Sequence, residues 1–308
     1  MSTMKIITIV CWVISAIVLI GLIIWFLTGS IFGAWSGRLG SNWSFGFNSD
    51  SWENLTGPFE ADGVYTVGTA GVDSIKIDWV AGEVTLKPHS GDNIQITEYA
   101  QRVLRDNEKL RYSMDGSTLE IKFRERGSGS ARMPQKRLEV LVPVELSQSL
   151  NTVSIDSVSG GIIITDITAS SLNCNTTSGS INASGHFNYV STNTVSGRLT
   201  LNNSAIGSTA DVDTISGDME LSGDFGKIIA NTVSGNISAT STQVPASFKA
   251  DTISGSITIA LPADAVISVN HSSVSGRLQS DLAIIMEGKG ADFEISTVSG
   301  STRIQALG

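Results

Sequence analysis

The sequence is short of cysteine, histidine and basic residues, and each shortage argues against a class of protein. Of its two cysteines, Cys11 lies in an apolar run and Cys174 in a repeat, so neither a disulfide framework nor a cysteine-based metal site is expected. The histidines His89, His186 and His271 share no position in the repeats, and their spacing indicates neither a metal cluster nor a catalytic dyad. The net charge is −9 and no recognition motif is present, so we expect no nucleic-acid partner.

Motifs of common catalytic sites are also missing. No Gly-x-Ser-x-Gly elbow or Ser-x-x-Lys pair stands in a supporting context. No Gly-Lys-Ser/Thr loop that would cradle a phosphate occurs. We therefore expect a protein that is not an enzyme, with no cofactor and no catalytic, cofactor-binding or metal-binding residue.

What the sequence does contain is one short phrase repeated eight times between Val153 and Ile304, clearest as Asn193-Thr194-Val195-Ser196-Gly197. The glycines of the eight copies are Gly160, Gly179, Gly197, Gly217, Gly235, Gly255, Gly276 and Gly300. Successive glycines are 19, 18, 20, 18, 20, 21 and 24 residues apart, and a period near twenty is typical of a repeat architecture.

Within each copy, positions counted from the glycine alternate between apolar and polar, as in β-strands. Position −7 is apolar in every copy, −2 is Val or Ile in seven, and +2 is apolar in seven. Since −7 and +2 differ in parity, the chain must bend once between them. We place this corner at −4, which is Asn, Asp or Ser throughout, because these residues favour turns.

One coil of this kind buries too few apolar side chains to offset its conformational entropy, so the coils must stack and share a core. The predicted fold is all-β, a parallel β-solenoid of about eight coils of 18–24 residues. Stacking would turn position −4 into an Asn/Asp ladder and positions −3 and −1 into outward ladders of hydroxyls. Those hydroxyls suit a glycan, peptidoglycan or ordered solvent, but small polar residues also occur on the solvent side of any strand, and we favour that interpretation.

The first part of the chain predicts a membrane anchor. Ile6 to Leu27 are 22 residues without a charge, long enough to cross about 30 Å of hydrocarbon as one helix. A cleaved signal peptide has a shorter apolar core, of about 7–15 residues, so we favour an uncleaved anchor with cleavage as the alternative. Lys5 on the N-terminal side predicts that the long C-terminal part lies outside the cytoplasm.

We divide the chain into four parts: the tail and anchor helix (1–28), a Gly/Ser/Trp-rich juxtamembrane linker (29–57), a strand-rich capping section (58–150) and the solenoid repeats (151–308). In the capping section, Gly82 to Leu86 resembles a degenerate coil. This section is expected to cover the first coil, which would otherwise expose an unpaired edge. Its residues Arg102 to Arg137 hold ten Lys/Arg against five acidic residues. They suit either an anionic polymer or lipid headgroups, or, as we favour, the solvent faces of hairpins.

Two further groups of residues suggest chemistry. Arg198 and Asp218 would lie on adjacent coils, about 4.8 Å apart, and we interpret them as a surface ion pair and not as an active site. Asp156, Asp213 and Asp251 at position −4 suggest calcium, but coils bearing Asn separate them. Amide stacking and turn capping explain this column with fewer assumptions.

The eight [Thr/Ser]-[Val/Ile/Thr]-Ser-Gly phrases, preceded by the strand ending Leu141-Val142-Pro143-Val144, resemble the bacterial "putative adhesin" family. These are β-strand-repeat domains of unknown function in envelope-associated proteins, and the resemblance covers about residues 60–304. It implies an interaction role at the cell envelope and supplies no catalytic residues.

The sequence therefore predicts a non-enzymatic protein of the cell membrane that crosses it once and presents a rigid solenoid for adhesion or binding. Its partners would be the membrane and a cell-wall or glycan polymer or a membrane protein. The alternatives are a self-assembling scaffold, since the last coil (Ser299 to Gln305) has no evident cap, and an envelope-stress sensor acting through a membrane partner.

Overall fold

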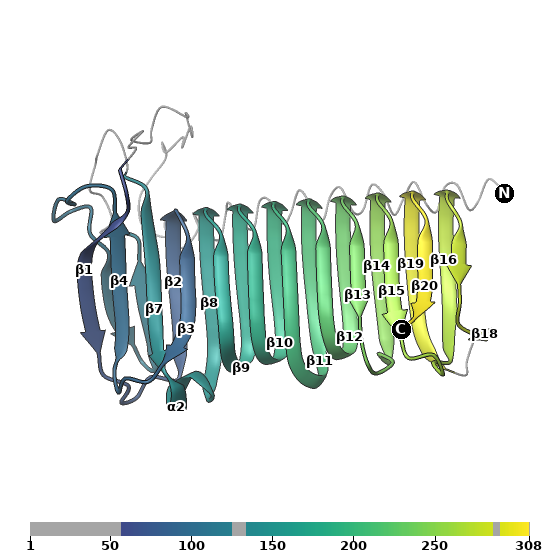
Figure 1. Cartoon of the computed structure of the whole chain (residues 1–308), viewed down its shortest axis with the longest axis horizontal. Coiled ribbons are helices and arrows are strands. Elements are labelled where there is room, and N and C mark those ends of the chain that lie inside the picture. The colour runs from purple at the N-terminus through teal and green to yellow at the C-terminus, as the bar shows by residue number, and fades with distance from the viewer. Residues whose placement is uncertain (1–56, 125–133, 286–289, 308) are drawn as a thin grey trace, which may run out of the picture.

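The computed structural model describes residues 57–124, 134–285 and 290–307, which form one long rod of stacked β-coils (Figure 1). The helix predicted at Ile6–Leu27 and the linker up to residue 56 lie outside the described residues, so both stay predictions. Within the described ranges, no helix combines the length and the apolar character needed to cross a bilayer.

The strands fall into three groups along the chain. Those of the capping section, with one short helix, are β1 (Glu60–Val67), β2 (Ser74–Ala81), β3 (Val84–His89), β4 (Ile94–Ala100), β5 (Arg111–Asp115), β6 (Thr118–Lys122), β7 (Lys136–Pro143) and α2 (Val144–Ser147). The central repeats form β8 (Leu150–Ser159), β9 (Ile162–Ser178), β10 (Ile181–Ser196), β11 (Leu199–Ser216) and β12 (Met219–Ser234). The last group is β13 (Ile237–Thr240), β14 (Ser247–Ser254), β15 (Ile257–Leu261), β16 (Ile267–Ser275), β17 (Leu278–Ser280), β18 (Ile284–Ile285), β19 (Ala291–Ser299) and β20 (Thr302–Ala306).

The repeats stack in parallel with like positions opposite each other. Between β10 and β11, for example, Val190 pairs with Ala210 and Ser196 with Ser216. Each coil contributes one strand segment before its glycine and one after it, and these segments build the two layers of the rod, which we call the pre-glycine and post-glycine layers. The register confirms the predicted parallel β-solenoid.

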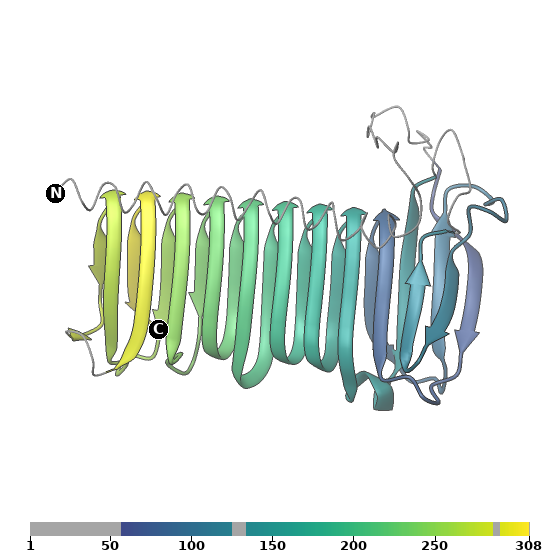
Figure 2. The same ribbon diagram turned by 180° about the vertical axis from the view of Figure 1, so that it is seen from behind.

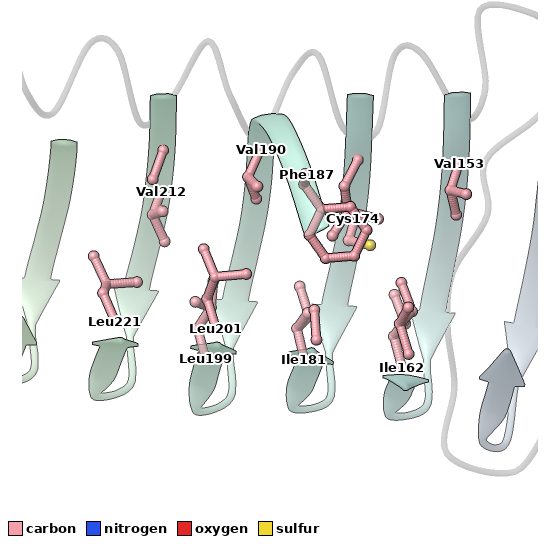
Figure 3. Packing of buried hydrophobic residues seen from close by; sticks show 14 of the residues in the cluster. Val153, Ile162, Cys174, Ile181, Phe187, Val190, Leu199, Leu201, Val212 and Leu221 are labelled. Atoms are coloured by element: carbon pink, nitrogen blue, oxygen red, sulfur yellow. The ribbon is translucent and has the colours of Figure 1, made fainter. Parts of the chain in front are cut away.

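The core fills the space between the two layers. Positions −7, −5 and −3 of the pre-glycine layer and +2 and +4 of the post-glycine layer point inward, as Figure 3 shows for Val190, Val212, Leu199 and Leu201. These four side chains are at most 1% exposed. Position −5 includes Cys174, which is fully buried and free, and burial raises the pKa of its thiol.

The corner of each coil is not where the sequence pattern placed it. The predicted corner at −4 is wrong, because those residues lie inside strands and point outward, partly buried. Strands end at the −1 serine and resume at +2, so the corner is the glycine and the residue after it. Consequently the −3 residues are buried, not outward, and the Val and Ile residues at −2 point outward and are partly exposed. Of the two predicted hydroxyl ladders, only the −1 serines are exposed.

The corner requires glycine because a side chain there would point into the backbone of the neighbouring coil. A Cβ built on Gly217 would lie 1.9 Å from the carbonyl oxygen of Gly197 in the neighbouring coil. No real Cβ contact is that short. The glycine column is therefore a packing requirement that holds the two layers at a sharp edge.

The stacking order of the last coils differs from their order in the sequence. β19 lies between β14 and β16, and β20 between β15 and β17, so the final coil of the chain is the penultimate coil of the rod (Figures 1 and 2). The expectation that the coil from Ser299 to Gln305 ends the rod without a cap is wrong, because β16 and β17 cover it.

The capping section adds two more coils and then closes the other end. β2 and β3 stack on β8 and β9 in parallel, which confirms the degenerate coil, and β6 and β7 stack outside them. Beyond these, β4 and β1 in the post-glycine layer and β5 in the pre-glycine layer run antiparallel. This change of direction ends the parallel stack, as expected of a cap.

Candidate functional site

The Asn/Asp column at −4 is a hydrogen-bonded ladder. The side-chain amide of Asn175 donates to Asp156 at 2.8 Å, and that of Asn193 donates to Asn175 at 2.9 Å. Asn231 donates in the same way to Asp213 at 2.8 Å. Amide stacking is confirmed, whereas the turn-capping role is wrong because no turn lies there.

Burial in this ladder raises the pKa of the carboxyl groups. The pKa of Asp213 rises to about 6, opposed by its bond from Asn231, and the pKa values of Asp156 and Asp251 also rise. Among the residues the structure describes, no three His, Cys, Asp or Glu side chains gather as a metal site. The column therefore stabilises the stack through its amides.

Other residues that the sequence singled out are placed separately along the rod. Arg198 and Asp218 form the predicted surface ion pair, at 3.6 Å, with side chains 63% and 44% exposed. His89 contacts the carbonyl of Asn93 at 2.8 Å, and His186 lies 3.3 Å from the hydroxyl of Ser204. Burial in the end coil lowers the pKa of His271. The structure brings no two of these histidines together.

In the described part of the basic window, several of the Lys and Arg side chains form ion pairs. Arg102 contacts Glu108 at 2.8 Å and Lys122 contacts Glu120 at 2.6 Å. The bonds from Arg102 lower the pKa of Glu108 to about 2. Paired charges of this kind fit the solvent faces of hairpins better than a patch for anions.

The cap contains a buried charge pair that the sequence interpretation missed. The ammonium of Lys136 lies 2.6 Å from the carboxylate of Glu98, and both side chains are fully buried. Lys136 also donates to the carbonyls of Glu108 and Phe123, and lies 3.8 Å from the centre of the Phe123 ring. Glu98 accepts the backbone N–H of Leu110 at 3.1 Å.

This pair fixes β4 against β7, against the loop before β5 through Glu108 and Leu110, and against Phe123, the residue after β6. Burial lowers the pKa of Lys136 to about 8 and raises that of Glu98, while the attraction between them opposes both shifts. A signal existed in the sequence, since Lys136 alternates in step with the inward residues Leu138 and Val140, and Glu98 with Ile96.

The residues next to this pair face outward and form a shallow hollow on the cap. Tyr99 follows Glu98 and Arg137 follows Lys136, and the two are opposite each other in the β4–β7 register. Together with Phe59, Glu83, Thr85 and Glu139 they line a hollow of about 220 Å³, which we call the cap hollow. One of its lining residues, Phe59, immediately precedes β1.

The side chains of the cap hollow are held by specific contacts. The guanidinium of Arg137 stacks over Phe59 at 4.2 Å. Glu139 pairs with Lys87 at 2.7 Å and accepts a hydrogen bond from the Tyr99 hydroxyl at 3.1 Å. Burial and the neighbouring Glu139 raise the pKa of Tyr99, so it stays a neutral donor.

Two layers of parallel strands wound around one continuous core, with a glycine corner in each coil, define a capped β-solenoid. The chain belongs to the Toastrack DUF4097 family, whose profile matches residues 72–306. That match spans the capping section from β2 onward, without β1, and all eight repeats.

Several solved structures are similar to this chain at low sequence identity. A putative adhesin from Bacteroides fragilis NCTC 9343 is 13% identical, with a TM-score of 0.51, over 79% of this chain and 96% of that one. A putative lipid binding protein from Parabacteroides distasonis ATCC 8503 is 17% identical, with a TM-score of 0.45, over 80% and 96%. A putative adhesin from Parabacteroides merdae ATCC 43184 is 11% identical, with a TM-score of 0.38, over 80% and 96%. No curated protein matches the chain significantly.

Proposed function

We propose that this chain is a non-enzymatic, membrane-anchored envelope protein whose rigid solenoid presents a surface for adhesion or binding. The observation that carries the proposal is the rod itself. Its core is continuous from the cap to the end coil, and its outward positions form straight columns of short, mostly polar side chains. Solenoids use such extended surfaces to bind large partners.

The apolar run Ile6–Leu27 supports anchoring by one helix, with the rod outside the cytoplasm. The Bacteroides fragilis structure, described as a putative adhesin, supports the same role by likeness of fold. A cell-wall polymer, a glycan or another membrane protein is the kind of partner proposed.

Retention of the full chain by bacterial cell-wall and membrane fractions tests the proposal. We expect the folded protein to be retained and the heat-denatured protein, under the same conditions, to be retained less. If no envelope component retains the folded chain, the adhesion proposal is wrong.

Self-association is a second candidate, favoured by the end coil. Within the described residues, β16 pairs with β19 along one edge, while on its other edge only Ile267 and Ser268 pair, with β18. The rest of that edge is a template for another strand. Sedimentation of the full chain in detergent tests this, and a strict monomer at high concentration would argue against assembly.

A further inference from the structure

The cap hollow carries balanced charge. Among its lining residues, Glu83 and Glu139 bring two carboxylates and Arg137 brings one cation. Lys87 does not line the hollow, but its ion pair with Glu139 balances the second carboxylate. A balanced set has no strong attraction for a phosphate or an anionic headgroup. It does offer several donors and acceptors at short range to a neutral ligand rich in hydroxyl groups.

The hollow also has an aromatic side. Phe59 presents a ring already covered by the Arg137 guanidinium at 4.2 Å, and Tyr99 lies beside it with its hydroxyl held by Glu139. A pyranose ring combines a face of C–H groups with a rim of hydroxyls. That combination matches a wall of aromatic rings next to carboxylates and a guanidinium.

Size and rigidity point the same way. At about 220 Å³ the hollow is smaller than the range of roughly 300–1,000 Å³ typical of drug-sized ligands, and suits one sugar ring. Its residues Tyr99 and Arg137 stand on strands fixed from inside by the Glu98–Lys136 pair, so little ordering is required on binding. Beside Glu83, the outward column continues with Gly161 and Ser180, whose small size leaves the hollow open along the rod.

We propose that the cap hollow binds one neutral hexopyranose ring of an envelope glycan. Tyr99 contacts the ring face, the Arg137-covered Phe59 closes the side of the hollow, and Glu83, Arg137 and Glu139 hydrogen-bond the hydroxyls of the sugar. This inference rests on the proposed binding function and assigns it a ligand class and a place.

Saturation-transfer NMR on the full chain tests it, with neutral gluco- and N-acetylgluco-configured trisaccharides as probes and a detergent without a sugar headgroup. Affinity for one ring is expected on the order of 1–10 mM, which this method detects. We expect Tyr99→Ala to remove most of the saturation transfer to the sugar. We expect Glu83→Gln to weaken sugar binding roughly 2–10-fold through one lost hydrogen bond. Glu83 is exposed, so its substitution does not endanger folding.

Tyr189→Ala is the matched control, because Tyr189 is 40% exposed on β10, away from the hollow, and its loss should change nothing. The inference is overturned if no trisaccharide at about 10 mM shows transfer, or if Tyr99→Ala and Glu83→Gln bind like the unsubstituted chain. Retention by envelope fractions separates the two proposals. If the chain is retained by envelope fractions but binds no sugar, only the proposal for the cap hollow is wrong. If it binds sugar but is not retained, only the adhesion proposal is wrong.

Discussion

At the corner of each coil, the neighbouring coil fits only because the corner residue is glycine and has no side chain. Gly217 contacts the backbone of Gly197, and its φ is not in the left-handed region, so only space is at issue. The backbone oxygen that a Cβ would meet cannot move without breaking the ladder on both sides.

We therefore expect Gly217→Ala to destabilise the rod by about 3 kcal/mol or more, because overpacking against backbone cannot relax. Gly68→Ala is the control, since a Cβ there meets nothing within 4 Å. Denaturant unfolding of both variants measures the difference. Equal stability of the two variants would contradict the close-contact explanation.

A second residue-scale effect concerns Asp213 in the Asn/Asp ladder. Burial raises its pKa in the folded chain to about 6, while its usual value is 3.8. Between these values the folded state binds the proton more tightly than the unfolded state does. The contribution of Asp213 to the free energy of unfolding therefore rises as pH falls from above 6 to about 4. At neutral pH its ionised carboxylate destabilises the folded state.

Asp213→Asn should therefore stabilise the chain at pH 7.5 by about 1–3 kcal/mol, and by much less at pH 4.5. The asparagine keeps an oxygen for the amide of Asn231 and carries no charge. Unfolding in denaturant at both pH values measures this, with Asp264→Asn in an exposed turn as control. A gain of equal size at both pH values would show that ionisation is not the cause.

The same columns show why residue-level burial could be predicted only in part. Positions −7, +2 and +4 are apolar in nearly every coil, and their inward placement followed from the pattern. Between them, position −3 is mostly Thr and −2 mostly Val or Ile. Both are β-branched strand formers, so only their polarity was left to predict which faces the core, and it favoured position −2. In the structure the reverse holds: Thr232 is 5% exposed, while Val233 is partly exposed.

At the scale of single elements, the cap depends on the pair between β4 and β7. Two charges taken out of water are stable only while both are present and hydrogen-bonded. Lys136 satisfies that condition through Glu98, Glu108 and Phe123.

Lys136→Met should cost about 3–5 kcal/mol, because it leaves Glu98 buried without a counter-charge. The double substitution Lys136→Met/Glu98→Gln should recover more than half of that loss. Lys122→Met is the control, since its pair with Glu120 is 48% exposed on the lysine side and should contribute at most about 1 kcal/mol. A double-mutant cycle in denaturant measures the coupling, and additive losses would refute the mutual dependence.

The cap as an element was predictable, but its interior was not. Alternation located the strands near Ile75, Ile94, Leu119 and Leu138, because each carries apolar residues at every second position. The pairing of Glu98 with Lys136 joins residues 38 positions apart in the sequence. No local pattern specifies such a contact; only the antiparallel return of β4 beside β7 creates it.

At the scale of the whole molecule, the order of the end coils follows from what each coil would expose. β19 and β20 bring Phe293, Ile295 and Ile304 to the core, all fully buried, and Phe293 stacks on Phe248 with ring centroids 5.3 Å apart. At the positions opposite these three, β16 and β17 bring Val269, His271 and Ser280, of which two are polar. Placing the polar coil last leaves the apolar one covered on both sides, which buries more apolar surface.

The sequence could not reveal this order, because every coil carries the same register and any coil can stack on any other. Ser254, Ser299 and Ser275 stand opposite one another in the observed stack, and the sequential stack would pair the same serines in a different order. Which coil ends the rod depends on the total apolar surface that the last two coils bury in each order.

Engineered disulfides distinguish the two orders. Opposed residues on adjacent strands lie about 4.8 Å apart and can be bridged, whereas residues two strands apart lie at about twice that distance and cannot. Position −4 offers Asp251, Ser296 and Ser272, which stand in that spatial order. In a Cys11→Ser background, we expect Asp251→Cys/Ser296→Cys to oxidise readily and Asp251→Cys/Ser272→Cys to stay reduced. Ser296→Cys/Ser272→Cys should oxidise in either order and is the positive control, while buried Cys174 does not compete. Electrophoretic mobility before and after reduction shows which pairs have formed a disulfide. The reverse outcome for the first two pairs would establish sequential stacking. In that order Ser296 would lie on the outermost coil and the rod would end in an apolar face.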